Sequence, residues 1–246
     1  MLRAAELSCE RAYPMVITPS DELLFKVPSP SKEDCPICLL PMPIDDTKCI
    51  YAPCCGKFIC HGCQYQTIMV GLAATSKMSS SLITKCAFCR EPTLVSDKEF
   101  IAMCKKRMAA GDGNAFCFLG MNYHDGLLGL QQSNGKAAEL WLKGAAHGSV
   151  PAQCQVAIAY HQGLGVDKDG KKAIHFYQLA AMGGDVASRF NIGVFEWCKY
   201  SSGEDGTKRA IKHWEIAAGA GFELAMDKIE RKSSTRHCQK HHTNVS

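Results

Sequence analysis

The sequence predicts two structural regions, a small metal-stabilised α+β region followed by an all-α solenoid of helical hairpins. Two patterns predict this. Four closely spaced cysteine pairs lie between residues 35 and 89, and small and aromatic residues recur every 36 or 37 residues between 111 and 221. With 246 residues, of which 46% are apolar, the chain has enough material for two modest domains.

The cysteine pairs have the spacing of zinc ligands. Three of the four pairs are separated by two residues, and the pairs are Cys35 and Cys38, Cys54 and Cys55, Cys60 and Cys63, and Cys86 and Cys89. Two cysteines at this spacing reach one ion from a tight turn, and structural zinc takes four such donors. The pairs therefore predict two zinc ions with no position left for water, which organise a stretch too small for a core of its own.

Around these pairs the sequence resembles a RING finger. The resemblance covers about residues 34–92 and rests on Cys-Pro-Ile-Cys at 35–38, Pro-Cys-Cys-Gly at 53–56, Cys-His-Gly-Cys at 60–63 and Cys-Ala-Phe-Cys-Arg at 86–90. In that family the pairs alternate between two ions, an arrangement called a cross-brace. The resemblance therefore implies one zinc held by Cys35, Cys38, Cys60 and Cys63, and a second held by Cys54, Cys55, Cys86 and Cys89.

One ligand of the second site departs from the common pattern. Lys57 stands where the family usually has a histidine, and a protonated lysine cannot bind zinc. Cys54 is the natural replacement, which makes an all-cysteine variant. His61 and Cys49 are the alternatives to Cys54.

A RING finger implies a ubiquitin ligase that holds a ubiquitin-charged conjugating enzyme and presents it to a substrate. No residue of the chain would form a covalent intermediate, and catalysis would come from positioning. Ile37 matches the apolar contact that the first zinc loop makes with the conjugating enzyme. Arg90 matches the position whose side chain hydrogen-bonds both that enzyme and ubiquitin.

Two residues depart from the docking surface of that family. Ala87 stands where a proline is usual, and Thr67 stands where a large apolar residue is usual, although Tyr65 or Ile68 would compensate for it. A second hypothesis is therefore an adaptor in which zinc only stabilises a binding module. A third, nucleic-acid binding, is disfavoured because the net charge of +4 is mild and the basic residues are not interleaved with aromatics.

A connecting helix is predicted over residues 96–110. Ser96 and Glu99 have the spacing of a capping box, and apolar residues follow at helical spacing. Such a helix would place the cysteine region rigidly against the first repeat.

Residues 111–232 are predicted to form three helical hairpins and a terminal capping helix. Each hairpin repeats a small residue in its first helix and an aromatic residue and a final glycine in its second: Gly120, Ala157 and Gly193; Trp141, Tyr177 and Trp214; Gly148, Gly184 and Gly221. Small residues let helices approach closely, the aromatic residues are interpreted as packing residues, and glycine ends a helix in the left-handed conformation. Stacked hairpins share a continuous core, as in an α-solenoid.

These hairpins resemble Sel-one-like repeats, relatives of the tetratricopeptide repeat. The resemblance is clearest at residues 160–166, which read Tyr-His-Gln-Gly-Leu-Gly-Val. The third hairpin is the most divergent, because Glu196 stands where the tyrosine would be. Arrays of this family bind other proteins along a concave face, so the resemblance implies a protein partner of unknown identity.

The two ends of the chain differ from these regions. Residues 1–33 hold four prolines and several serines, and residues 233–246 form a short basic tail, so both are predicted to be mobile. Charged residues near the start argue against a secretory signal, and no apolar run reaches the length of a membrane span. We therefore expect an intracellular protein, in the cytoplasm, the nucleus or both, without disulfides and without a membrane partner.

Overall fold

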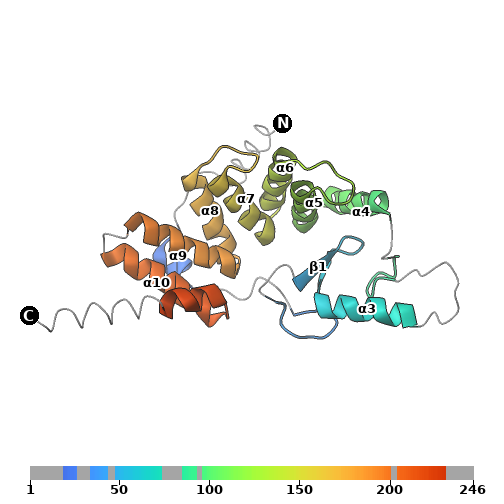
Figure 1. The fold of residues 1–246 in the computed structure, drawn as a ribbon, viewed down its shortest axis with the longest axis horizontal. Coiled ribbons are helices and arrows are strands. Elements are labelled where there is room, and N and C mark those ends of the chain that lie inside the picture. Colours follow the sequence, from blue (N-terminus) through green and yellow to red (C-terminus); the bar gives the residue numbers. More distant parts are fainter. Residues whose placement is uncertain are drawn as a thin grey trace, which may run out of the picture. The chain divides into compact units, whose positions relative to one another are not determined.

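The structure, a computed structural model, describes residues 19–26, 34–43, 48–73, 85–92, 96–200 and 204–230. Its elements are α2 (Asp21–Leu24), β1 (Cys49–Ala52), β2 (Lys57–Cys60), α3 (His61–Ala73), α4 (Asp97–Ala109), α5 (Gly113–Asp125), α6 (Asn134–Ala146), α7 (Val150–Gln162), α8 (Gly170–Met182), α9 (Val186–Tyr200) and α10 (Glu204–Gly219) (Figure 1). Residues 223–230 are also helical. No described helix is both long enough and apolar enough to cross a membrane.

The chain divides into two compact units. Unit 1 comprises residues 1–16 and 32–173, and unit 2 comprises residues 17–31 and 174–246. Unit 1 therefore holds the whole cysteine region together with α4 to α7. Unit 2 holds α9, α10 and the short helix α2 from near the start of the chain.

A β-hairpin and the helix that follows it form the centre of the cysteine region. Strands β1 and β2 are antiparallel, with Cys49 opposite Cys60 and Ala52 opposite Lys57. The turn between them is closed by Gly56, whose φ is 73° and whose N–H donates to the carbonyl of Ala52 at 2.8 Å. Glycine adopts this left-handed conformation without the steric penalty of a Cβ. Because α3 begins directly after β2, the last residue of the strand and the first turn of the helix lie together.

The hairpin is fastened to the helices by one carboxylate. Tyr51 of β1 donates its hydroxyl hydrogen to Asp112 Oδ2 at 2.7 Å, and Arg107 of α4 donates to the same oxygen from Nη2 at 2.8 Å. The other oxygen, Oδ1, accepts from the backbone N–H groups of Asn114 and Ala115 and so caps the N-terminus of α5. The Asp112 side chain thus joins the hairpin, α4 and α5.

An aromatic cluster lies beside this carboxylate. The ring of Tyr51 is centred 5.3 Å from that of Phe58 and 5.6 Å from that of Phe118, and Phe118 lies 5.7 Å from Phe100. These distances are those of contacting aromatic pairs. Phe100 belongs to α4 and Phe118 to α5, so apolar packing and hydrogen bonding hold the hairpin on the same two helices.

Helix α4 lies in the range over which the connecting helix is predicted. It begins after Ser96, whose hydroxyl accepts from the N–H of Glu99, while the Glu99 carboxylate accepts from the N–H of Ser96 at 2.8 Å. This is the reciprocal capping box that the sequence predicts. The helix ends at Ala109, one residue earlier than expected.

Small residues face large aromatic ones within the hairpins. A Cβ at Gly120 would lie 2.6 Å from Nε1 of Trp141, and a Cβ at Gly193 would lie 2.5 Å from Nε1 of Trp214. Both tryptophans are buried, at 1% and 3% exposure, which confirms that they are packing residues. The indole occupies the space that any side chain at the glycine would need.

The glycines predicted to end the second helices have the expected conformation. Gly148, Gly184 and Gly221 have φ values of 77°, 91° and 90°. After the last of them the chain becomes helical at 223–230, where Ala225 is fully buried in one cluster with Trp214. This final helix covers the end of the third hairpin, as a capping helix would.

Part of the N-terminal range differs from the expectation of mobility. Within residues 1–33, the structure describes residues 19–26, and these include α2, with the side chain of Leu24 fully buried. The reason is tertiary, since Arg189 donates a hydrogen bond to the carbonyl of Leu24 from 165 residues away. The rest of residues 1–33 and all of residues 233–246 lie outside the described residues.

Candidate metal centre

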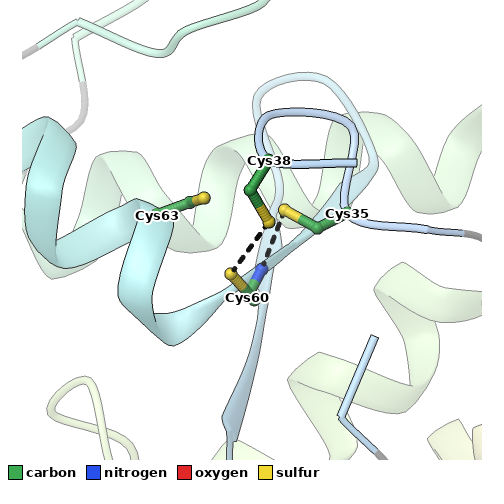
Figure 2. Close-up of side chains that lie close together, drawn as sticks. All are labelled: Cys35, Cys38, Cys60 and Cys63. Atoms are coloured by element: carbon green, nitrogen blue, oxygen red, sulfur yellow. Dashed lines mark hydrogen bonds between the residues drawn. The ribbon is translucent and has the colours of Figure 1, made fainter. Parts of the chain in front are cut away.

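The first group of cysteines comes from the loop at 35–38 and from the junction of β2 and α3. The sulfur atoms of Cys35, Cys38, Cys60 and Cys63 all lie within 4.8 Å of one another (Figure 2). Cys38 Sγ lies 3.9 Å from Cys60 Sγ, and the N–H of Cys60 donates to Cys35 Sγ at 3.5 Å. Figure 2 shows the four side chains pointing toward a common centre.

The second group joins the hairpin turn to the loop at 86–89. Its members, again within 4.8 Å of one another, are Cys54, Cys55, Cys86 and Cys89. Cys55 Sγ lies 3.7 Å from Cys86 Sγ. The adjacent cysteines reach the same group because the turn is tight, with the N–H groups of Cys55 and Gly56 both donating to the carbonyl of Ala52.

The sulfur separations suit tetrahedral zinc. A Zn–S bond of about 2.3 Å places neighbouring sulfurs of a tetrahedron about 3.8 Å apart. The separations of 3.9 and 3.7 Å match that edge, whereas a disulfide would need about 2.05 Å. Along the chain, the first and third pairs form one group and the second and fourth pairs form the other. This is the interleaved order that the RING resemblance implies.

The two Cys-x-x-Cys loops have the same backbone conformation. In the first, Cys35 N–H donates to the carbonyl of Leu40 at 2.8 Å, and Leu39 N–H donates back to Cys35. In the second, Cys86 N–H donates to Glu91 at 2.8 Å, and Arg90 N–H donates back to Cys86. The residue after the second cysteine is left-handed in both, with φ of 58° at Leu39 and 62° at Arg90.

Backbone amides favour the thiolate form of the first cysteine in each of these loops. Burial alone would raise the pKa of Cys35, but hydrogen bonds from the backbone at Cys60, Cys38 and Ile37 outweigh it and lower the pKa to about 6. Similar hydrogen bonds at Cys89 and Phe88 lower the pKa of Cys86 to about 7 against the effect of burial. The thiolate is the form that binds a metal.

The remaining sulfurs show why each group suits a cation. Burial, followed by contact with the neighbouring sulfurs, raises the pKa of Cys63 to about 12 and also raises the pKa of Cys54. Burial likewise raises the pKa of Cys55. Four clustered thiols cannot all ionise unless positive charge compensates them, and a divalent cation supplies that charge. All four donors of each site are cysteines, so the chemistry that such an ion supplies is structural.

The alternatives to Cys54 lie elsewhere. Cys49 donates its thiol hydrogen to the carbonyl of Pro43 at 3.4 Å, and His61 is an exposed residue at the start of α3. Among the described residues, the structure brings Cys54 and neither of these two into the second group. The histidines and the cysteine of the C-terminal tail lie outside the described residues.

The two residues matched to the RING docking surface are exposed. Ile37 is 38% exposed between the cysteines of the first loop, and Arg90 is exposed directly after the last cysteine. Phe88, which sequence reasoning did not single out, is 36% exposed at the position equivalent to Ile37 in the second loop. The signal that could have found it is this equivalence of position between the two Cys-x-x-Cys loops.

On α3, Thr67, Tyr65 and Ile68 differ in their surroundings. Thr67 donates its hydroxyl hydrogen to the carbonyl of Cys63 at 2.8 Å, so its polar atom is used within the helix. Tyr65 is 58% exposed and offers an aromatic ring to a partner. The side chain of Ile68 lies outside the described part of the chain.

The C-terminal part of the fold is that of a helical-repeat protein, and comparison with known proteins gives its class. The family model of the Sel1 repeat matches residues 115–149, 150–185 and 188–222. The chain therefore contains three Sel1 repeats, in the register that the sequence period predicts.

Known relatives and solved structures are similar to part of this chain. Protein SHC1 of Saccharomyces cerevisiae, from two strains, is 32% identical over 143 residues, which are 54% of this chain and 27% of that protein. The chain thus spans about a quarter of the length of these relatives. A Sel1 repeat protein from Oxalobacter formigenes has a TM-score of 0.49 at 21% identity, covering 67% of this chain and 61% of its own. The Escherichia coli protective antigen c5321 has a TM-score of 0.47 at 22% identity, covering 67% and 32%.

Proposed function

We propose that residues 34–92 form a RING-type zinc finger that binds two zinc ions, and that the protein is a ubiquitin ligase. The observation that carries the proposal is the alternation of the four cysteine pairs between two groups of tetrahedral dimensions. If the region consisted of two independent zinc loops, cysteine pairs that are neighbours along the chain would bind the same ion. An interleaved arrangement is what a cross-braced finger needs, and it holds both loops against one hairpin and helix.

The finger presents apolar side chains that suit a conjugating enzyme. Each Cys-x-x-Cys loop exposes one apolar residue between its cysteines, Ile37 in the first and Phe88 in the second. Exposed apolar side chains on rigid loops are typical of a protein-binding surface. We assign Ile37 to contact with the conjugating enzyme.

Arg90 is the proposed contact to ubiquitin. The left-handed backbone at this residue is fixed by the hydrogen bond from its own N–H to Cys86, so the direction of the side chain is set by the loop. Its planar guanidinium offers several donors at once, which suits simultaneous bonds to ubiquitin and the conjugating enzyme. The zinc ions would hold the loops, and no residue of this chain would bond covalently to ubiquitin.

The three Sel1 repeats are proposed to bind the substrate or another protein partner. The hairpins of these repeats pack against one another through small and aromatic residues. The outward faces of their helices are not needed for this packing and are available to bind a partner. The hairpin of the finger is fastened to α4 and α5 through Tyr51, Arg107 and Asp112. This contact would fix the direction in which the finger presents ubiquitin relative to the first repeat.

An adaptor without ligase activity is the second candidate. Thr67 favours it, because the position that usually offers a large apolar residue is occupied by a hydroxyl bonded to the backbone of its own helix. Ala87 in place of proline points the same way. In that case the finger would serve as a metal-stabilised binding module.

A discharge assay separates the two candidates. The full chain is mixed with a panel of ubiquitin-charged conjugating enzymes, and loss of the thioester is followed with free lysine as acceptor. We expect the wild-type protein to accelerate discharge at least tenfold with some enzyme, by ordering the attack geometry. Ile37→Ala should remove the gain by weakening docking, and Arg90→Lys should reduce it while keeping the charge.

Exposed Lys98, on α4 outside the finger, provides the control, and Lys98→Ala should discharge ubiquitin like the wild type. Zinc content is measured for every variant, so that lost activity is not confused with a lost fold. No acceleration with any enzyme, from protein that holds two zinc ions, would favour the adaptor.

A further inference from the structure

A short segment of the chain lies on the third repeat within unit 2. Residues 20–25, which include α2, contact α9 and α10, and α2 is drawn in blue beside α9 in Figure 1. The side chain of Leu24 is fully buried, and its backbone carbonyl accepts a hydrogen bond from the guanidinium of Arg189. The segment therefore places one apolar side chain and one backbone acceptor on the repeat.

Arg189 is a buried cation at this contact. Arg189 is only 2% exposed, and its Nη2 donates to the carbonyl of Ala181 at 3.0 Å. Among the described residues, the guanidinium bonds these two carbonyls and no carboxylate. A buried cation needs acceptors to offset its lost hydration, so the carbonyl of Leu24 stabilises a group that the repeat has already buried.

The next side chain, Phe25, lies among basic groups of α10. Its ring is centred 4.7 Å from the ring of His213, 4.2 Å from Nζ of Lys212 and 5.3 Å from Cζ of Arg209. Cations at these distances from an aromatic face are attracted to it. Glu196 forms an ion pair of 3.1 Å with Arg209 and so holds it in place. Glu196 stands where a tyrosine is expected in the repeat, and this ion pair gives the substituted residue a role.

The helical conformation of the segment depends on its contact with the repeat. Helix α2 has four residues, Asp21–Leu24, and a single turn is far too short to persist alone in water. Its start is capped by Ser20, whose hydroxyl accepts from Leu23 N–H, yet the Leu23 side chain is 58% exposed and adds little packing. Glu22, which precedes the buried leucine, lines one pocket together with Lys212 of α10, so an acidic side chain of the segment lies near a basic group of the repeat.

We propose that the surface formed by Arg189, Arg209, Lys212 and His213 is a recognition site for a short helical segment of a partner protein, in which acidic residues precede a Leu-Phe pair. Residues 20–25 occupy this site as a tethered competitor. The inference rests on the proposed role of the repeats in binding a protein partner, and it is independent of the proposed ligase activity.

A tethered competitor reduces binding by a predictable amount. A segment that belongs to the same chain as its site competes at an effective concentration that we take as on the order of 1 mM. If the isolated segment binds with a Kd of about 100 μM, its own copy in the chain raises the apparent Kd for an outside peptide about tenfold. Emptying the site should therefore strengthen peptide binding by about that factor.

The test uses the full chain and a fluorescein-labelled peptide with the sequence of residues 17–28. Fluorescence anisotropy should show about tenfold tighter binding to Leu24→Ala/Phe25→Ala than to the wild type. Phe25→Ala alone, which leaves Leu24 in its pocket, should give an intermediate gain and keeps the test valid if the double variant is unstable. Adding Lys212→Glu to either variant should weaken binding, whereas Lys171→Glu, at an exposed lysine that belongs to unit 1, should not.

Two results would overturn the proposal. One is the absence of peptide binding to a Phe25→Ala protein whose circular dichroism matches the wild type. The other is equal binding of a control peptide in which Leu24 and Phe25 are replaced by alanine. Neither result bears on ubiquitin discharge, so this inference and the ligase proposal fail separately.

Discussion

The cysteine region and the repeats bury very different side chains. Among the described residues of 34–92, the buried apolar groups include Cys35, Met42, Tyr51 and Cys86, whereas the repeats bury tryptophans, tyrosines and a long series of alanines. The first region gathers eight sulfurs into two groups, and the second places glycine against indole. The difference teaches that one region is built around two groups of sulfurs that could hold a metal and the other around close packing, so the two should respond to different perturbations.

The largest expected effect follows from removing one sulfur ligand. Cys60→Ser should reduce the zinc content from two ions per chain to about one, because a structural zinc contributes on the order of 10 kcal/mol through its complete ligand set. Native mass spectrometry measures the zinc count. Far-UV circular dichroism should keep most of its helical signal, since the repeats need no metal.

The matched control is Cys49→Ser. Cys49 lies directly opposite Cys60 in the hairpin but belongs to neither sulfur group, so this variant should keep both zinc ions. Loss of one zinc from the Cys49 variant, or a wild-type protein with far fewer than two, would contradict the division of ligands given above.

A smaller effect is expected from adding one methyl group to the repeats. In Gly193→Ala the new Cβ would meet Nε1 of Trp214 at 2.5 Å and the carbonyl of Ala210 at 3.0 Å. Such overpacking lowers the free energy of unfolding by about 1–3 kcal/mol, and urea denaturation followed by circular dichroism measures it. Zinc content should be unchanged.

Gly219→Ala supplies the comparison, because it adds the same methyl group in α10 where no heavy atom lies within 4 Å. Alanine favours a helix over glycine by about 1 kcal/mol, so this variant should be as stable as the wild type or more so. A Gly193 variant of equal stability would show that the indole can move aside.

The smallest effect concerns the contact between the two regions. Burial alone would raise the pKa of Asp112, but hydrogen bonds from Tyr51 and Arg107 outweigh it and lower that pKa. Because the folded pKa lies below the unfolded one, the stabilisation is present at neutral pH and is lost as the pH falls through the folded value. Asp112→Asn should lower the free energy of unfolding by about 1.5 kcal/mol at pH 7.

The same variant should flatten the pH dependence as the pH falls below 3.8, the ordinary pKa of an aspartate, and urea unfolding at each pH measures this. Asparagine keeps an oxygen for capping α5, so the remaining difference reports the charge. Equal acid sensitivity in both proteins would mean that other carboxylates govern it.

Local and periodic features could be predicted from the sequence. The capping box at Ser96, the helix-ending glycines and the buried Trp141 and Trp214 follow from spacing alone, because each depends on neighbours in its own turn of helix or its own repeat. The grouping of the cysteines came from a family resemblance and not from spacing, which would equally allow neighbouring pairs to share an ion.

Contacts between distant residues could not be predicted. Tyr51 and Asp112 are 61 residues apart, and neither has a motif that indicates its partner. The prolines and serines of residues 1–33 predict mobility, and the single turn of α2 within them leaves no periodic pattern that would indicate otherwise. The contact that orders it comes from Arg189, which is remote in sequence. The exposure of Phe88 depends on the conformation of its Cys-x-x-Cys loop, which the spacing of the cysteines does not give.

The two oxygens of the Asp112 carboxylate divide their work, since Oδ1 accepts from the first turn of α5 and Oδ2 accepts from Tyr51 and Arg107. A force that pulled the hairpin outward would load the bond from Tyr51 to Oδ2 and the ring contact between Tyr51 and Phe118. The first turn of α5 would keep its own acceptor throughout. Loss of the hairpin contact would therefore leave the N-terminal cap of α5 in place.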